Sequence, residues 1–160
     1  MRDCINTLVP GLAATWKGPV AGYIDSQFAW GPADWGKFSG RKVRISDQAD
    51  PLAEVMDWET GNAPLPAVKA AVTRRYDIGL STVVYCSESK WQQAKPSLAG
   101  LPVAWWVAHW VGPPPPKWWF RKARWWRAAG VPPETCAIQF ASFPTFDESL
   151  VNTAAWPDWA

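Results

Sequence analysis

The sequence predicts an α/β protein with a mainly parallel sheet. Short apolar or β-branched runs alternate with helix or loop signals, a pattern typical of parallel strands joined by crossovers. The 160 residues suit one domain, and a chain of this length needs neither disulfides nor a structural metal to fold. No internal repeat or second domain is evident.

Each expected strand is an apolar run bounded by turn residues. The expected strands are 20–26, 41–46, 51–59, 81–87, 101–110 and 134–142. The clearest helix signal lies in 60–79, where Pro66 suits the first turn, Arg74 and Arg75 the last turns, and Gly79 the C-terminal cap. Further short helices are expected within 31–38, 88–100 and 120–130.

Composition excludes several classes of protein. Hydrophobic residues make up 48% and charged residues 19%, so the chain is not intrinsically disordered. No apolar run approaches the roughly 20 residues of a membrane-spanning helix. The net charge of +2 argues against bulk nucleic-acid binding. The 14 Trp are unusually many, and exposed Trp commonly marks a binding face for sugars or proteins.

The cysteines and the N-terminal residues exclude further classes. Cys4, Cys86 and Cys136 have no metal-ligand spacing, so we expect buried free thiols and no metal site. A cysteine peptidase is not favoured either. Residues 1–18 form a mixed lead-in segment without a clear apolar core, and we predict that they are not a signal peptide.

The most informative triplet is Asp57-Trp58-Glu59, at the end of an apolar run. Residues two apart on a strand project to the same side, about 7 Å apart, so both acids point together. Asp25 and Asp147 also follow expected strands and are predicted to reach the same rim. Crowded carboxylates raise one another's pKa, which gives one group that donates a proton and another that stays ionised. Glycosidic cleavage requires that division of roles. The alternative without a function is that Asp57 and Glu59 are solvated residues at the end of a strand.

Six motifs in order strengthen the glycosidase interpretation: GYIDSQFAW, VMDWETG, VVYCS, PVAWWVAHW, AIQFAS and FDESLVN. Together they resemble the glycoside hydrolase family 25 lysozymes, in the shortened form found in actinobacteria and their phages. That family has a first strand ending in Asp, a later D-x-E strand and a final acidic segment. The resemblance covers roughly residues 20–152.

The resemblance implies a fold, an activity and site residues. The fold would be a compact, incomplete (β/α) barrel of the glycoside hydrolase type, and the substrate peptidoglycan, cleaved between N-acetylmuramic acid and N-acetylglucosamine without a cofactor. Glu59 would be the general acid/base. Asp57 would orient the acetamido group or stabilise the charged intermediate, and Asp25 matches the first-strand aspartate. The expected substrate-binding residues are Asp147, Tyr85, Trp106, Gln139, Trp30 and His109.

The chain departs from the family pattern in two respects. Only residues 26–56 separate the first aspartate from the D-x-E motif, which implies an abbreviated barrel. The expected organisation is a lead-in over 1–18, a barrel over 19–152 with a Trp/Pro-rich insertion at 110–126, and a Trp-containing tail over 153–160. For His109, a structural or rim role is favoured over catalysis.

The segment KWWFRKARWWR combines aromatic and basic residues. It is compatible with an amphipathic helix packed on the barrel, a protein interface, a sugar platform, or a nucleic-acid or membrane-surface contact. Its interface candidates are Trp118, Trp119, Trp125 and Trp126.

Two functions follow from the sequence. The first is a peptidoglycan-cleaving, muramidase-like glycosidase, encoded by a phage and acting at the cell wall from the virion or from the host cytoplasm before lysis. The alternative is a non-catalytic virion structural or decoration protein. It would reuse the fold to bind cell-wall glycan or, through the Trp-rich segment, other phage structural proteins.

Overall fold

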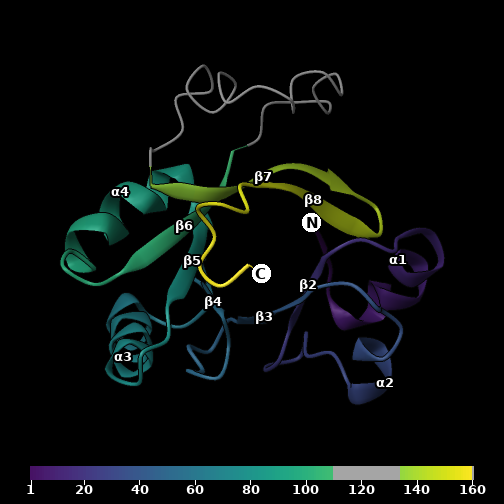
Figure 1. The fold of residues 1–160 in the computed structure, drawn as a ribbon, viewed down its shortest axis with the longest axis horizontal. Coiled ribbons are helices and arrows are strands. Elements are labelled where there is room, and N and C mark those ends of the chain that lie inside the picture. Colours follow the sequence, from purple (N-terminus) through teal and green to yellow (C-terminus); the bar gives the residue numbers. More distant parts are fainter. Residues whose placement is uncertain (110–133, 160) are drawn as a thin grey trace.

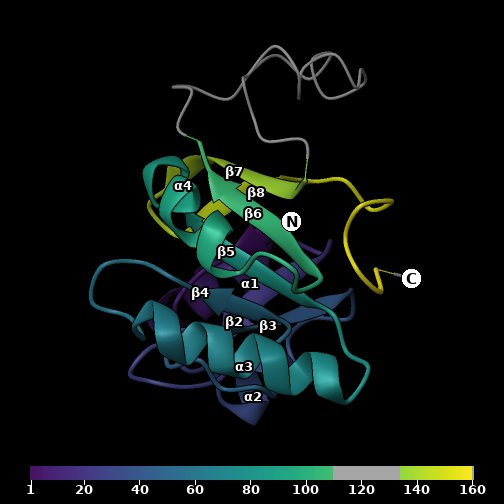
Figure 2. The same ribbon diagram turned by 90° about the vertical axis from the view of Figure 1, so that its left-hand side faces the viewer.

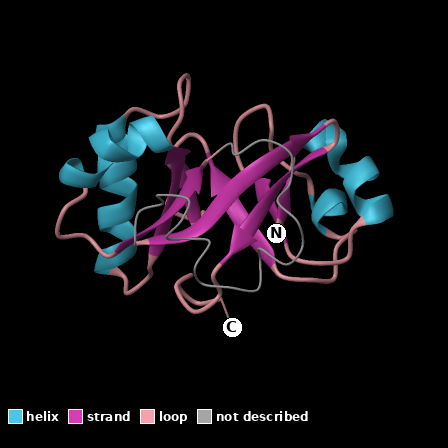
Figure 3. Cartoon of the chain, turned by 90° about the horizontal axis from the view of Figure 1, so that it is seen from above, coloured by secondary structure: helices cyan, strands magenta, loops and turns pink. Residues whose placement is uncertain are grey.

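The computed structural model describes residues 1–109 and 134–159. It is an α/β structure in which eight strands close into a barrel in chain order. Helices flank the barrel on two sides, α1 and α2 on one and α3 and α4 on the other (Figures 1 and 3). The predicted α/β class is confirmed.

The strands are short, as expected for a small barrel. They are β1 (Arg2–Asp3), β2 (Val20–Tyr23), β3 (Lys42–Ser46), β4 (Val55–Asp57), β5 (Thr82–Ser87), β6 (Val103–Ala108), β7 (Thr135–Phe143) and β8 (Phe146–Val151). The helices are η1 (Asn6–Leu8), α1 (Val9–Thr15), α2 (Pro32–Trp35), α3 (Leu65–Asp77) and α4 (Glu88–Ser97). Gly79 follows α3 with a φ of +77°, which fits its expected capping position.

The barrel is mixed in strand direction. Strands β1 to β7 pair in parallel, whereas β8 is antiparallel to both β7 and β1. A parallel pair needs a long crossover, but an antiparallel pair needs only a tight turn. Pro144 and Thr145 make that turn between β7 and β8. The final strand is therefore added without a helix, which is how a short chain reaches eight strands.

Two expectations differ from this arrangement. The barrel was expected to be incomplete, but its ring of strands is closed. The abbreviation lies in the crossovers, since no helix joins β3 to β4 or β7 to β8. Residues 1–18 were expected to precede the barrel, but Arg2 and Asp3 form β1 and pair with both β2 and β8. A strand of two residues is too short to produce a readable alternation pattern.

Alternate residues of the strands pack on opposite sides of the sheet. Met56, Val84 and Trp105 face outward and pack with residues of α3 and α4, which lie side by side on the barrel (Figure 2). Val83 and Trp106 belong to the other set, which fills the barrel interior. The three cysteines are free and buried, as expected. No helix of residues 1–109 and 134–159 is long and apolar enough to cross a membrane.

The segment after β8 folds back over the barrel (Figure 1). Trp156 is 3% exposed and packs against Trp106, at 5.9 Å between ring centroids, and against Trp159. Arg41, just before β3, lies 5.8 Å from the Trp159 ring. These contacts place the two indoles at the end of the barrel where the parallel strands begin. The barrel interior is thereby closed at one end.

We expect Trp156→Ala to lower the free energy of unfolding by about 3–5 kcal/mol, because it opens a cavity beneath Trp106. Urea unfolding monitored by circular dichroism measures this. Leu52 is 66% exposed, and Leu52→Ala should change stability by less than about 0.5 kcal/mol. Equal effects of the two substitutions would show that the indole does not close the barrel.

Candidate functional site

Acidic side chains gather at the end of the barrel opposite the Trp156 closure. Asp3 is the last residue of β1 and Asp57 the last of β4, and Glu59 follows two residues later. Asp147 lies near the start of β8, which faces the same end because β8 runs antiparallel. Active sites of parallel α/β folds form at this end of the strands.

A pocket of about 330 Å³ opens among these residues at the barrel mouth. It is lined by Asp3, Tyr23, Ile45, Glu59, Tyr85, Trp106, Gln139 and Asp147. Five of the expected site residues thus line one pocket: Glu59, Tyr85, Trp106, Gln139 and Asp147. The pocket is small and combines acids with aromatic rings.

A hydrogen-bond network fixes the floor of this mouth pocket. The Tyr85 hydroxyl donates to Oε1 of Gln139 at 2.6 Å. The Gln139 amide in turn donates to Oδ2 of Asp3 at 3.3 Å and to Oδ2 of Asp147 at 3.5 Å. Trp106 donates from Nε1 to the Ser149 hydroxyl at 3.0 Å. The floor residues therefore hold one another and the two aspartates in place.

Asp57 lies beneath the pocket and is only 3% exposed. The Tyr23 hydroxyl donates to its Oδ2 at 2.9 Å, while its Oδ1 is buried without a partner among the described residues. Burial, followed by the charge of Glu59, raises the pKa of Asp57 to about 7. Asp57 thus changes charge near neutral pH.

Glu59 is half-buried and faces the pocket. Burial raises the pKa of Glu59, the positive charge of Lys90 lowers it, and Asp147 raises it. Lys90 itself lies over the Trp58 ring, at 5.0 Å from the centroid. A carboxyl group whose pKa is raised and that reaches a pocket is suited to donate its proton.

Asp3 and Asp147 form a second acidic pair. Burial and then the charge of Asp147 raise the pKa of Asp3 well above its ordinary value. Burial raises the pKa of Asp147 as well, and its hydrogen bond with Ser142 opposes the shift. Like charges this close disfavour full ionisation, so the site holds protons that isolated carboxyl groups would have released.

Asp25 does not join this group. Its Oδ2 accepts from the Ser46 hydroxyl and its Oδ1 from the Asp47 amide. The Ser26 hydroxyl donates to Asp47 at 2.8 Å, so these polar contacts tie the loop after β2 to the loop after β3. Asp25 lines neither of the pockets at this end of the barrel.

Two other expected site residues also lie elsewhere. Trp30 is buried on the outer side of β2, where its ring lies against Gly22 and its Nε1 donates to the Cys4 carbonyl at 2.8 Å. His109 pairs through Nδ1 with Glu88 at 2.7 Å and lines neither pocket. That contact fits a rim or structural role. Trp118, Trp119, Trp125 and Trp126 lie outside the described residues.

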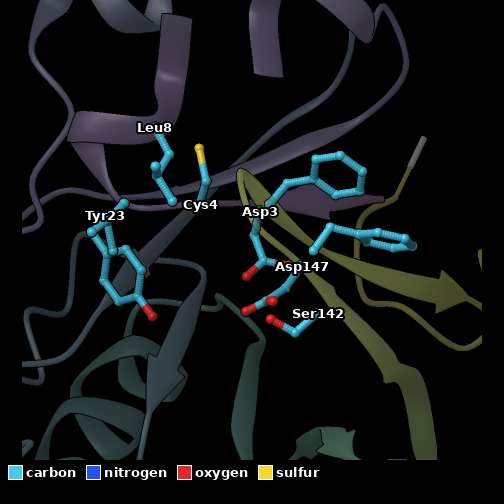
Figure 4. A pocket seen from close by; sticks show the side chains of 9 residues that line it. Asp3, Cys4, Leu8, Tyr23, Ser142 and Asp147 are labelled. Carbon is cyan, nitrogen blue, oxygen red and sulfur yellow. The ribbon is translucent and has the colours of Figure 1, made fainter. Parts of the chain in front are cut away.

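The structure adds pocket residues that the sequence patterns missed. Asp3 lies in a strand too short to recognise. Tyr23 ends β2, two residues before the aspartate that was selected. Ser142, Phe143 and Phe146 flank the β7–β8 turn, whose Pro-Thr pair is not a usual hairpin signal. Together with Asp147 they line a second, larger pocket beside the first (Figure 4).

Neither thiol nor metal chemistry is indicated by the described residues. Burial raises the pKa values of Cys4, Cys86 and Cys136 to about 12, so all three stay protonated. Among residues 1–109 and 134–159, no group of three or more His, Cys, Asp or Glu side chains is arranged to hold a metal ion.

We expect the protein to be less stable at pH 8 than at pH 5. The folded state holds a proton on Asp57 up to about pH 7, but the unfolded chain releases it near pH 3.8, so stability falls as pH rises through that window. Asp57→Asn should reduce the loss between pH 5 and pH 8 by about 2–3 kcal/mol. Urea unfolding at both pH values measures it. Asp77→Asn, at an exposed position, should leave the loss unchanged. If Asp57→Asn and the native chain lost the same free energy of unfolding between pH 5 and pH 8, the loss could not be attributed to Asp57.

Comparison of the chain with protein-family models, curated proteins and solved structures found no match. The arrangement offers one half-buried acid at a pocket, two coupled aspartates beside it, and a buried aspartate beneath.

Proposed function

We propose that this chain is a glycoside hydrolase that cleaves peptidoglycan in the manner of the shortened family 25 lysozymes. One observation carries the proposal: Glu59, Asp3 and Asp147 line a single pocket at the mouth of the barrel, with Asp57 buried beneath them. Hydrolysis of a glycoside needs one protonated and one ionised carboxyl group close to the scissile bond.

Glu59 is the proposed general acid. It lines the pocket, it is half-buried, and burial raises its pKa, so it retains a proton where a free glutamate would be ionised. In the reaction its proton passes to the glycosidic oxygen and the bond from that oxygen to the anomeric carbon breaks. A water molecule then adds to the carbon, and the proton it releases returns to a site carboxylate.

Asp147 is the proposed ionised partner. It lines the same pocket, and its charge acts on Glu59. A carboxylate there stabilises the positive charge that develops on the sugar ring as the bond breaks. Asp57 acts from beneath: it does not line the pocket, and burial and the charge of Glu59 raise its pKa to about 7. When it is ionised, Asp57 adds to the stabilisation of positive charge on the sugar ring, and it does so less when it is protonated.

The aromatic floor supports a sugar substrate. Tyr85 and Trp106 pack edge to face, with centroids 5.0 Å apart, at the base of the mouth pocket. Rigid aromatic and amide side chains of this kind bind sugars through ring faces and hydroxyl hydrogen bonds. The Tyr85–Gln139 hydrogen bond holds the floor in one arrangement before substrate binds.

We expect Glu59→Gln to reduce the release of reducing sugar from purified actinobacterial peptidoglycan by at least about 100-fold, because the amide cannot supply the proton. Circular dichroism and urea unfolding verify that the variant is folded. Glu134→Gln is the matched control: Glu134 is exposed, pairs with Lys95 and precedes β7 at the opposite end of the barrel, so full activity is expected.

Undiminished cleavage by Glu59→Gln would refute the assignment of the acid. A folded native chain that releases no reducing sugar would refute the catalytic proposal and favour the non-catalytic virion protein. In that case the chain should be sought among the proteins of a phage particle.

A further inference from the structure

A second pocket adjoins the barrel mouth, between the segment that follows β1 and the β7–β8 hairpin (Figure 4). It is an open pocket of about 490 Å³ and shares Asp3, Tyr23 and Asp147 with the mouth pocket. We call it the hairpin pocket. Its further lining residues are Cys4, Ile5, Leu8, Ser142, Phe143 and Phe146.

The hairpin pocket has one apolar and one polar wall. Phe143 and Phe146 flank the turn, with ring centroids 4.8 Å apart, and Ile5 and Leu8 complete the apolar wall. The Arg2 guanidinium lies 4.1 Å from the centroid of Phe146 and 4.2 Å from that of Trp16, so a cation–π contact helps to hold the Phe146 ring. The aromatic wall is therefore fixed without a ligand.

The polar wall contains a hydrogen-bond acceptor that has no partner among the described residues. Asp3 is 6% exposed, and its Oδ1 is buried without a hydrogen-bond partner among the described residues. Buried polar atoms normally have a partner, so an unpaired one at a pocket indicates a group that the ligand supplies. In Figure 4 the carboxyl groups of Asp3 and Asp147 lie close together beside Ser142.

The Asp3–Asp147 pair offers both a donor and an acceptor. Burial and the charge of Asp147 raise the pKa of Asp3, so the pair retains a proton. A protonated carboxyl donates one hydrogen bond and still accepts others. An amide presents the complementary N–H and C=O groups. A ligand that places an amide at the polar wall and a methyl group at the apolar wall satisfies both.

We propose that the hairpin pocket is a subsite for an N-acetylated sugar ring, next to the ring cleaved at Glu59. The ring face and the acetyl methyl group contact the apolar wall, and the amide and hydroxyl groups contact Asp3, Asp147 and Ser142. The proposal rests on the proposed function for its substrate class. A sugar without the acetamido group has no amide to form a hydrogen bond with Asp3. The pocket therefore distinguishes N-acetylated sugars from plain hexoses.

Binding is tested on the full chain, labelled with ¹⁵N, by titrating N-acetylglucosamine and, separately, glucose. We expect N-acetylglucosamine to shift the amide signals of Cys4, Ile5 and Phe143, and glucose to bind at least about tenfold more weakly. Equal binding of the two sugars, or no shift at these amides with N-acetylglucosamine, would overturn the proposal.

Two variants locate the ligand. Ser142 is exposed at the pocket rim, so Ser142→Phe should block the pocket without disturbing the core and abolish the shifts. Phe143→Ala removes part of the aromatic wall and should weaken binding about tenfold. Ser39→Phe, an equal change at an exposed position before β3, should leave binding unchanged. If Ser142→Phe bound N-acetylglucosamine as tightly as the native chain does, the ligand could not lie in the hairpin pocket.

Glu59→Gln separates this proposal from the proposed function. The variant should bind N-acetylglucosamine as the native chain does, because Glu59 does not line the hairpin pocket. Cleavage of peptidoglycan without binding in the hairpin pocket would overturn the subsite and leave the enzyme. Selective binding in a chain that cleaves nothing would keep the subsite and overturn the catalytic proposal.

Discussion

Closure of the barrel depends on β1, a strand of two residues. Arg2 and Asp3 pair in parallel with β2 and antiparallel with β8, and without them the sheet would have two open edges. The same pairing buries Asp3 at the barrel mouth and brings the β7–β8 hairpin next to the segment that follows β1. One short pairing thus completes the fold and forms both pockets. Edge strands left unpaired would also favour aggregation.

The acids at the barrel mouth lower the free energy of unfolding, and packing elsewhere in the molecule compensates for this loss. Burial raises the pKa values of Asp3, Asp57, Glu59 and Asp147, and the charges of neighbouring acids add to the shift for the first three. The folded state is therefore destabilised as these groups ionise. The packed interior and the indole closure at the other end supply the opposing stabilisation. A cluster of this kind is hard to explain as a purely structural feature, because apolar residues of similar volume would be more stable.

Tryptophan serves several structural purposes in the described residues. Trp106 fills the interior, Trp156 closes one end, Trp105 packs against Trp91 of α4, and Trp30 packs against Trp35 of α2. Trp30, Trp105, Trp106 and Trp156 are therefore core residues. Large rings fill a narrow barrel efficiently, since one indole replaces several aliphatic side chains.

The sequence by itself determined the α/β class, most strands and the long helix with its glycine cap. These depend on local signals: apolar runs, capping residues and the two-residue period of a strand. It also selected five of the residues that line the mouth pocket. Only the tertiary structure decided which acids meet. It brought in Asp3, separated Asp25, moved Trp30 to the outer core and created the hairpin pocket. Those outcomes depend on barrel closure, which pairs residues 2–3 with residues 147–148, and no local pattern encodes a pairing across so long a separation.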